Sequence, residues 1–281
     1  MPIRSCITGT GSALPPGIVS NDDLARRIDT SDAWIVERTG IHRRRIAAEG
    51  VRTSDLAVEA ATAAMAAAGV GPTDIDLVIV ATATPDDTFP ATATRVQARL
   101  GIRQGAAFDV AAVCSGFVYA LSVLISFMKE NGMRKGLLFT ADPYSKIVDQ
   151  NDKNTSLLFG DAAAVTLLSG NPVFAPMKFT FGTTGSHYED LICKNGKLFM
   201  NGRAVFNFTA KVIPEDIKNL LTINNLSKDE IDLFVFHQGS KIIVDTLAKK
   251  LEIPPNKVVF NAMNFGNTVS SSIPIILEEE L

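Results

Sequence analysis

The chain has 281 residues, of which 46% are hydrophobic and 20% are charged. This length and composition can bury a substantial core, in one large domain or in two closely packed halves, and they exclude a disordered tail. The formal net charge of −3 gives no electrostatic footprint for DNA or RNA, so we expect no nucleic-acid partner. Cys6, Cys114 and Cys193 lack the paired spacing of a zinc site or a disulfide framework, which suits a reducing cytosol and predicts no metal site.

The predicted elements begin with an apolar strand at Ile3–Gly9 and a helix at Ser54–Ala67, which leads into a buried strand that ends at Val80. A strand at Phe108–Val113 precedes a buried helix at Gly116–Met128. The apolar runs GLLFTA and AAAVTLLS follow as two further strands. Buried strands that alternate with helices predict an α/β protein with layers built around mostly buried sheets.

One of these stretches also has the length of a membrane helix, because Val110–Met128 runs 19 residues without a charge. Asp109 precedes it, however, and Cys114-Ser115-Gly116 interrupts it, so we expect a strand end, a turn and a buried helix. The N-terminal residues 1–16 lack the apolar stretch of a secretory signal. We therefore expect a cytoplasmic protein with no membrane partner.

The second half of the chain repeats the pattern of the first. Ile75-Asp76-Leu77 reappears 156 residues later as Ile231-Asp232-Leu233, after a helix predicted at Pro214–Leu221. A second similarity pairs Ala107–Gly116 with Val259–Thr268. The chain is therefore interpreted as a duplication, with one half at residues 1–170 and the other at residues 171–281.

Further strands are predicted at Val173–Phe181, which would open the second half, and at Leu233–Phe236. The counterparts of GLLFTA and AAAVTLLS would lie beyond residue 281, so we expect the final strands of the second half to be missing and the chain to be truncated at its C-terminus. Composition changes at the matching place in the first half, since no lysine precedes Lys129. A hybrid gene and compositional drift both stay open as explanations.

Three short motifs, at Val113–Phe117, Phe236–Gly239 and Phe265–Thr268, contain the residues with the most informative chemistry. Cys114 lies between a predicted strand and a helix N-terminus, where amide dipoles lower the pKa of a thiol. His237 closes a predicted strand, and Asn267 lies in a Gly-Asn-Thr turn. Taken alone, each residue also fits a purely structural role, as an inert buried cysteine, a core histidine or part of an ordinary turn. Together they occupy matching strand ends, where α/β folds place their sites.

This trio suits a condensation reaction. An imidazole N–H and an amide N–H form a pair of donors for an oxygen that becomes negative, as in the enolate made by decarboxylation of a malonyl thioester. A cysteine would hold the primer acyl group as a thioester until the carbanion attacks it. The predicted chemistry is a Claisen condensation.

The chain resembles the thiolase superfamily and, most closely, the β-ketoacyl-acyl-carrier-protein synthase III family, which starts bacterial type II fatty acid synthesis. The likeness covers essentially the whole chain and includes Thr30–Gly40, Thr88–Gly101, Phe108–Leu121, Leu158–Val165, Met200–Phe206, His237-Gln238 and Gly266–Thr268. It implies the thiolase-like αβαβα five-layer duplication, a catalytic triad of Cys114, His237 and Asn267, and a homodimer. It also implies acyl-CoA and malonyl-acyl-carrier-protein as partners, with no separate cofactor because the coenzyme A thioester is a substrate.

The resemblance further implies a set of substrate-binding residues. Trp34 and Arg38 match the pair that holds the nucleotide end of coenzyme A, with an aromatic face and a cation. Thr30 and Lys153 fall at neighbouring positions, and Phe89 matches a residue that lines the primer pocket of the opposite subunit. The remaining positions are the channel residues Phe159 and Phe206, and Gly239 and Ser240 after the histidine.

Three departures from the family pattern limit this transfer. The family usually continues Ala-Asn-x-Arg after the histidine-glutamine pair, whereas residues 239–242 are Gly-Ser-Lys-Ile, so a pantetheine-positioning asparagine and a carrier-docking arginine are missing. Lys241, Lys249 and Lys250 offer an alternative basic surface, if they are not simply a solvated helix face. The segment between Gly185 and Lys197 is short, and the glycine-rich C-terminal loop that furnishes an oxyanion donor is absent, a loss worth roughly a hundredfold in rate.

The leading hypothesis is an acyltransferase that joins an acyl-CoA primer, acetyl-CoA in the simplest case, to malonyl-acyl-carrier-protein. A specialised enzyme that primes a polyketide, quinolone or acyl-glycan pathway shares the same trio and stays open, as does an inactive truncated fragment. A papain-like hydrolase uses the same residue types in the same order but has no support from the repeat. Plain thiolases use a second cysteine where this chain has Asn267.

Overall fold

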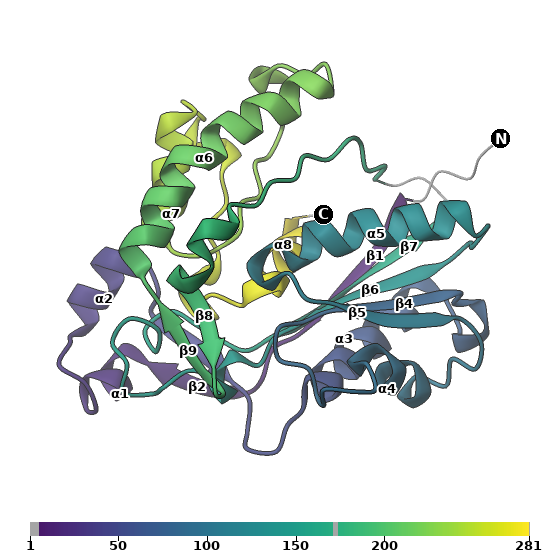
Figure 1. Cartoon of the computed structure of the whole chain (residues 1–281), viewed down its shortest axis with the longest axis horizontal. Coiled ribbons are helices and arrows are strands. Elements are labelled where there is room, and N and C mark those ends of the chain that lie inside the picture. The colour runs from purple at the N-terminus through teal and green to yellow at the C-terminus, as the bar shows by residue number, and fades with distance from the viewer. Residues whose placement is uncertain (1–5, 171–173, 281) are drawn as a thin grey trace.

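The computed structural model describes residues 6–170 and 174–280. A five-stranded sheet lies at its centre (Figure 1). Across the sheet the strands are β1 (Cys6–Ala13), β7 (Ala163–Ser169), β6 (Gly136–Ala141), β4 (Leu77–Ala81) and β5 (Ala106–Val110). Strands β5, β4 and β6 are parallel, whereas β7 pairs antiparallel with both β6 and β1. The carboxyl ends of three neighbouring strands therefore meet at one edge, where α/β folds place their sites.

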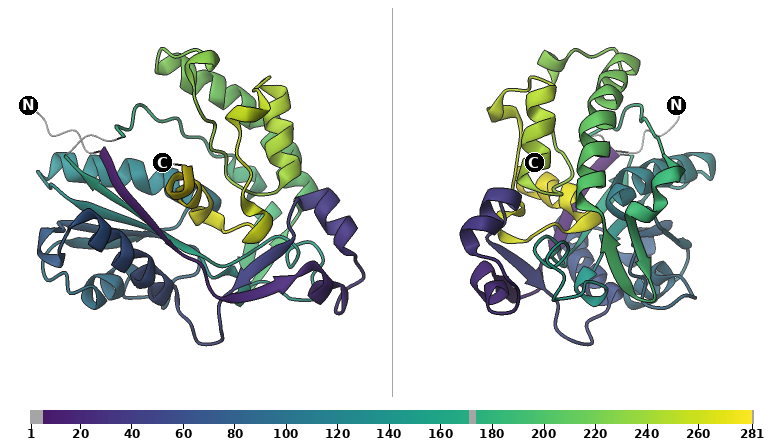
Figure 2. Two further views of the ribbon diagram at one scale, coloured as in Figure 1. Left: turned by 180° about the vertical axis from the view of Figure 1, so that it is seen from behind. Right: turned by 60° about the vertical axis from the view of Figure 1, so that its left-hand side comes forward.

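Helices cover both faces of this sheet (Figures 1 and 2). The helices α3 (Thr53–Ala68) and α4 (Thr92–Arg99) pack on one face, and α5 (Gly116–Glu130) and α8 (Ser272–Glu280) pack on the other. Alternate residues of β4 belong to the two cores, because Val78 faces α3 whereas Ile79 faces α5. The predicted α/β layers and buried strands are confirmed.

The apolar stretch 110–128 splits as expected. It contains the end of β5, the 3₁₀ turn η2 (Val113–Ser115) and most of α5. In the part of the chain that the structure describes, Val113–Glu130 is the one segment long and apolar enough to span a membrane. Phe117, Ala120 and Leu124 of α5 are buried against the sheet, as in the core helix of a layered protein.

Two small antiparallel pairs lie outside the central sheet, and the first carries the predicted substrate residues Thr30, Trp34 and Arg38. Strands β2 (Gly17–Ser20) and β3 (Arg43–Ile46) pair antiparallel and are joined through α1 (Asn21–Ala25) and α2 (Asp32–Thr39). Strands β8 (Leu191–Lys194) and β9 (Lys197–Met200) form a hairpin. Its turn residues are Asn and Gly, both with positive φ, 52° and 73°, as a two-residue hairpin turn requires.

An outer helical layer lies beyond α5 and α8, where α6 (Gly202–Ile223) and α7 (Lys241–Lys250) run side by side (Figure 2). The prediction of a helix at Pro214–Leu221 was too short. The helix begins earlier because the Asn201 side chain accepts a hydrogen bond from Ala204 N–H and caps it. Pro214 is therefore inside the helix rather than at its first turn, and its ring is buried.

The predicted strands of the second half are wrong as regular strands. Val173 lies outside the described residues, and in residues 174–181 a single bridge joins Phe174 to Ile7. Phe234 forms one bridge, to Val258. A strand becomes regular only when a neighbour satisfies its backbone groups along its length. These extended segments have no such continuous neighbour among residues 6–170 and 174–280.

The internal repeat is visible in the backbone. Before each Ile-Asp-Leu copy, a 3₁₀ turn, η1 (Pro72–Asp74) or η5 (Lys228–Glu230), is closed by an acidic side chain. The Asp74 carboxylate accepts from Gly71 N–H at 2.9 Å, and the Glu230 carboxylate accepts from Ser227 N–H at 2.7 Å. The same local structure thus recurs after 156 residues.

A second repeated pair corrects one sequence alignment. The turns η2 and η8 (Val269–Ser271) each begin with a valine of positive φ, 49° for Val113 and 54° for Val269, and each leads directly into a helix. These valines are 156 residues apart, so Cys114 corresponds to Ser270. The predicted pairing of Ala107–Gly116 with Val259–Thr268 was four residues out of register, because similar letters were matched rather than backbone conformations.

Candidate active site

The turn that carries Cys114 lies just beyond the carboxyl end of β5 and just before the N-terminus of α5. A positive φ at Val113 is a backbone outlier for a β-branched residue, and such outliers gather at functional sites. Gly116 allows the close approach of η8, since a Cβ there would lie 3.1 Å from the Ser270 Cβ and 3.2 Å from the Ala81 Cβ. The turn that carries Cys114 and the turn η8 therefore pack directly on each other.

His237 is held from α8. Its Nδ1 lies 2.8 Å from the Ser272 Oγ. Burial lowers the pKa of His237 to about 4, although a hydrogen bond to the Val269 backbone opposes this shift. The ring is therefore neutral at physiological pH and keeps one N–H. A Cβ on Gly239 would lie 3.6 Å from the His237 Nε2, so this nitrogen borders a position without a side chain.

Asn267 is fixed at both its backbone and its side chain. Its backbone N–H donates to Leu158 C=O at 2.7 Å, and its C=O accepts from Gly160 N–H at 3.0 Å. The Asn267 Oδ1 accepts from Val269 N–H at 2.9 Å. Because the oxygen of the amide is used in this way, its NH₂ group is the part left to bind a substrate oxygen.

The segment Asn267–Ser272 thus brings the predicted trio together. Cys114 packs in one apolar cluster with Val269, Asn267 bonds to the amide of Val269, and His237 contacts Ser272. The three residues come from positions far apart in the sequence and gather around this segment. The strand-end argument holds for Cys114, which follows β5, but not for His237, because residues 233–236 form one bridge rather than a strand.

The electrostatics of Cys114 differ from the prediction. A helix N-terminus was expected to lower the pKa of the thiol, but burial and, next, the Asp142 carboxylate raise it to about 12. The sulfur lies among apolar side chains and near a buried acid, and these effects outweigh the amide dipoles. The resting nucleophile is therefore a neutral thiol.

Asp142 is fully buried directly after β6. Its carboxylate accepts from Ala83 N–H at 2.8 Å and from the Ser270 hydroxyl. Burial raises the pKa of this carboxyl to about 6, although these hydrogen bonds oppose the shift. Asp142 therefore ties the end of β4 to η8, and it carries a charge only above mildly acidic pH.

An apolar wall surrounds the Cys114 side of the site. Its buried members are Tyr144, Val148, Phe159, Leu198 and Val269. The Tyr144 and Phe159 rings lie 4.9 Å apart. Phe159, predicted as a channel residue, belongs to this cluster, whereas Phe206, in α6, does not. A wall of this kind can hold an acyl chain.

The predicted nucleotide-binding residues gather at a second place. Above the Trp34 ring lie the Arg38 guanidinium, at 4.6 Å from the ring centroid, and the Lys153 ammonium, at 4.4 Å. Lys153 also donates to the Asp29 carbonyl, next to Thr30. The Thr30 hydroxyl oxygen is buried without a hydrogen-bond partner in the described structure. Two cations over an aromatic ring suit a phosphate-bearing aromatic ligand.

The remaining predicted substrate-binding residues lie in two different places. Gly239 and Ser240 lie between His237 and α7, and Ser240 is buried. Phe89 is 83% exposed in the loop between β4 and α4, so it does not line the site of its own chain.

Sequence reasoning missed Asp142, Ser270 and Ser272 as parts of the site. A signal existed for each, because Asp142 is an acid directly after a buried strand and the serines belong to a run just after Asn267. A hydrogen-bond partner far away in sequence gives such a residue its role, and sequence spacing does not reveal that partner.

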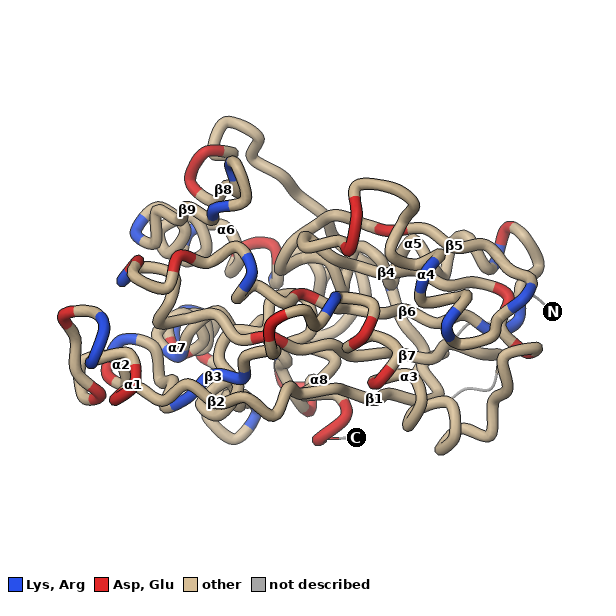
Figure 3. The backbone as a smooth tube through the Cα atoms, turned by 90° about the horizontal axis from the view of Figure 1, so that it is seen from below, with Lys and Arg blue, Asp and Glu red and all other residues tan. Residues whose placement is uncertain are grey.

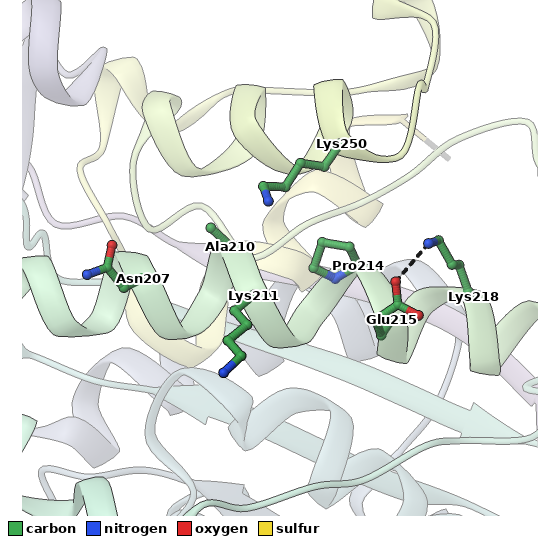
Figure 4. Close-up of a pocket in the computed structure, with 7 residues that line it drawn as sticks. All are labelled: Asn207, Ala210, Lys211, Pro214, Glu215, Lys218 and Lys250. Atoms are coloured by element: carbon green, nitrogen blue, oxygen red, sulfur yellow. Dashed lines mark hydrogen bonds and ion pairs between the residues drawn. The ribbon is translucent and has the colours of Figure 1, made fainter.

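A basic groove lies between α6 and α7 (Figure 4). Its volume is about 390 Å³, and it is lined by Asn207, Ala210, Lys211, Pro214, Glu215, Lys218 and Lys250. Lys218 pairs with Glu215 at 2.7 Å. Elsewhere Lys and Arg are interspersed with Asp and Glu, in keeping with the small net charge (Figure 3). Within the described ranges no three acidic, histidine or cysteine side chains group as metal ligands.

Comparison with known proteins now identifies the family. A family model described as 3-oxoacyl-[acyl-carrier-protein] synthase III matches residues 108–185, and the model of its C-terminal part matches residues 221–281. Over 99% of the chain and 90% of the relative, it is 44% identical to "Beta-ketoacyl-[acyl-carrier-protein] synthase III" of Rhodospirillum centenum and 45% identical to that of Paramagnetospirillum magneticum. The chain belongs to this family.

Solved structures agree with this assignment. The synthase III of Pseudomonas aeruginosa PAO1 superposes with a TM-score of 0.92 at 36% identity, covering 98% of this chain and 88% of that one. The priming β-ketosynthase of the R1128 polyketide pathway gives 0.90 at 29% identity, with 99% and 88% covered. The thiolase-like fold expected from the resemblance is therefore confirmed.

Proposed function

We propose that this chain catalyses the decarboxylative Claisen condensation of an acyl-CoA primer, in the simplest case acetyl-CoA, with malonyl-acyl-carrier-protein, the step that initiates fatty acid synthesis. The observation that carries the proposal is the meeting of one thiol and two N–H donors on the segment Asn267–Ser272. Family membership supplies the reaction class, and the chemistry of the three groups matches it.

The first half-reaction is acyl transfer to Cys114. The sulfur attacks the acyl-CoA thioester carbonyl, a new S–C bond forms, the bond to the coenzyme A sulfur breaks, and the thiol proton leaves with coenzyme A. Since burial keeps the pKa of the thiol high, proton loss and attack belong to the same step. No cofactor is needed, because the coenzyme A thioester is itself the substrate.

The second half-reaction uses the donor pair. The His237 ring, neutral because burial lowers its pKa to about 4, and the Asn267 amide each donate an N–H to the malonyl thioester oxygen. As carbon dioxide leaves, that oxygen becomes an enolate and both hydrogen bonds strengthen. The enolate carbon then attacks the Cys114 thioester, forms the new C–C bond and returns the sulfur as thiolate, which takes up a proton.

Substrate contacts follow from the remaining clusters. Trp34, Arg38, Lys153 and the unpartnered Thr30 hydroxyl hold the nucleotide end of coenzyme A, and the wall around Phe159 holds the acyl chain. The exposed Phe89 reaches the pocket of a second copy, which makes the active form a homodimer. The enzyme works in the cytoplasm, where its coenzyme A and carrier-protein substrates are found.

The acidic carrier protein docks on the groove between α6 and α7. The lining has three lysines and one acid, of which Lys218 pairs with Glu215 and Lys211 points its ammonium away from Lys250 (Figure 4). The net charge of the lining is positive, and complementary charge steers association. Ile242 stands where the family has a docking arginine, and its side chain is 49% exposed on the same helix as Lys250. The positive surface is thereby moved along α7 rather than lost.

A specialised priming ketosynthase is the second candidate. Two observations favour it: the likeness to the R1128 priming enzyme and the unusual Gly-Ser-Lys-Ile stretch at residues 239–242. A panel of labelled acyl-CoA primers, each offered with malonyl-carrier-protein and with malonyl-CoA, separates the two. Preference for acetyl-CoA and the carrier-bound extender supports the first candidate.

The triad is tested by measuring its two half-reactions separately. Cys114→Ala should abolish transfer of a labelled acyl group to the protein, whereas His237→Ala and Asn267→Ala should leave that transfer intact. Each donor variant should reduce release of labelled carbon dioxide from the malonyl thioester by roughly a hundredfold or more.

The matched control is Cys193→Ala, because Cys193 is an exposed cysteine in β8 and should change neither half-reaction. The proposal would be contradicted if Cys114→Ala still accepted the acyl group at the wild-type level. It would also be contradicted if His237→Ala and Asn267→Ala released carbon dioxide at the wild-type rate.

A further inference from the structure

Ser272 makes a contact that the proposed chemistry has not yet used. It is the first residue of α8 and is 3% exposed. Its Oγ lies 2.8 Å from the His237 Nδ1 and 3.3 Å from the Gln238 backbone nitrogen. One buried hydroxyl therefore contacts both the histidine ring and the backbone next to it.

The positions of the protons follow from these two contacts. A backbone N–H can only donate, so the Ser272 oxygen accepts from Gln238. The hydroxyl has a single proton, and pointing it at the His237 Nδ1 makes that nitrogen an acceptor. A neutral imidazole then carries its own proton on Nε2.

The tautomer with its proton on Nδ1 is disfavoured when the donors and acceptors around Ser272 are counted in the same way. An Nδ1–H would make the Ser272 oxygen accept two N–H groups, and its own proton would lose the acceptor that His237 provides. The hydrogen bonds of the described residues show no other acceptor for that hydroxyl. A buried donor without a partner is unfavourable.

The neighbouring serines are committed elsewhere. Ser270 donates to Asp142, and Ser271 donates to the Thr140 carbonyl at 3.0 Å. Of the three consecutive serines, only Ser272 contacts the His237 ring in the described structure. A Cβ at Gly239 would lie 3.6 Å from the His237 Nε2, so residue 239 places no side chain over this nitrogen. The ring also has a hydrogen bond to the Val269 backbone, and because this bond favours the protonated ring its acceptor is the carbonyl, to which an Nε2–H can donate.

We propose that Ser272 is a positioning residue that holds His237 as the Nε2–H tautomer, so that the ring presents a donor rather than a lone pair to the malonyl thioester oxygen. The inference rests on the donor role proposed for His237. It adds the group that sets the direction of that hydrogen bond, as a second residue commonly does for a working histidine.

The test reads the tautomer directly. The chain has only three histidines, so the ¹⁵N shifts of histidine-labelled protein can be assigned with His42→Gln and His187→Gln variants. Wild-type His237 should show a protonated Nε2 and an unprotonated Nδ1. Ser272→Ala should give a mixture of tautomers, Ser272→Thr should restore the wild-type pattern, and the matched control Ser271→Ala should leave it unchanged.

Kinetics provide the second readout. Ser272→Ala should release carbon dioxide roughly tenfold to a hundredfold more slowly, because a weakened donor loses part of the enolate stabilisation. Acyl loading of Cys114 should stay at the wild-type rate, since that step does not use His237. Ser272→Thr should recover most of the lost rate.

Several results would overturn the inference. A wild-type His237 with its proton on Nδ1 would do so without any variant, even if Ser272→Ala failed to fold. An unchanged tautomer in Ser272→Ala, or equal losses in both half-reactions, would also do so. Failure of the proposed function looks different, because wild-type protein would then release no carbon dioxide while its His237 tautomer still followed Ser272.

Discussion

At the scale of single residues, the site is governed by burial. Burial alone accounts for the largest part of three pKa shifts, which leave the Cys114 thiol, the His237 ring and, below about pH 6, the Asp142 carboxyl uncharged. Burial around an uncharged thiol and an uncharged ring strengthens hydrogen bonds to a charge that appears only during the reaction. The same burial raises the pKa of the Cys114 thiol and makes it a weak nucleophile at rest, and the Asp142 carboxylate adds to this effect.

This coupling predicts the effect of Asp142→Asn on Cys114. Asparagine can still accept from Ala83 N–H and donate to the Ser270 oxygen, but it removes the negative charge that raises the pKa of the thiol. We expect Cys114 to be alkylated by iodoacetamide several-fold faster at about pH 8. A Cys193→Ala background removes the exposed competitor, and an unchanged rate would show that the carboxylate does not act on the sulfur.

At the scale of elements, the site depends on one close backbone crossing. The Leu158–Val165 segment passes the loop before Asn267 so tightly that a Cβ on Gly160 would lie 1.9 Å from the Phe265 carbonyl oxygen. The same crossing supplies both backbone bonds of Asn267. A glycine is therefore required at position 160 for contact rather than for turn geometry.

Gly160→Ala should consequently displace the Asn267 loop. We expect the free energy of unfolding to fall by about 2–4 kcal/mol, because the clash is with backbone that cannot rotate away. Carbon dioxide release should fall far more than acyl loading of Cys114. Gly182→Ala is the control, since a Cβ there meets nothing within 4 Å. Equal stability of the two variants in urea denaturation would refute this account.

At the scale of the whole molecule, the two halves each supply part of the site. Cys114 and Asp142 come from the half that holds the five-stranded sheet, whereas His237, Asn267 and Ser272 come from the other. The repeated turns η2 and η8 pack on each other, and the position that holds the proposed nucleophile Cys114 in one half holds Ser270, a hydrogen-bonding serine, in the other. Duplication thus built one site from two equivalent turns.

This shared site predicts an unusual pH dependence of stability. The folded-state pKa of His237 lies below its ordinary value, so His237 favours folding above about pH 6.5 and this stabilisation is lost as the pH falls to about 4. The folded-state pKa of Asp142 is raised, so its contribution is present at low pH and is lost as the pH rises to about 6. Each is worth on the order of 3 kcal/mol, and the two oppose each other.

Asp142→Asn should therefore expose the histidine effect. Between about pH 6.5 and pH 4, the free energy of unfolding of the variant should fall more steeply than that of the wild type, and near pH 8 the variant should be the more stable protein. Urea denaturation across this pH range provides the measurement. Parallel curves for the two proteins would mean that folding does not raise the pKa of Asp142.

Sequence by itself determined the α/β class and the repeat of 156 residues, and it singled out Cys114, His237 and Asn267, because periodicity and short motifs are local properties. It missed the early start of α6, where a cap three residues away outweighs an internal proline. It also predicted regular strands in the second half, since a pattern of apolar residues does not show whether a neighbour is there to pair.

Only the tertiary structure decided the electrostatics and the supporting contacts. The pKa of the Cys114 thiol depends on its burial and on the nearby Asp142 carboxylate. The tautomer proposed for His237 depends on Ser272, which is 35 residues away in the sequence. These quantities are set by groups that meet through folding. Residue types and spacing therefore identified the side chains that could react. The neighbours that surround each side chain in the folded protein set its protonation state at rest.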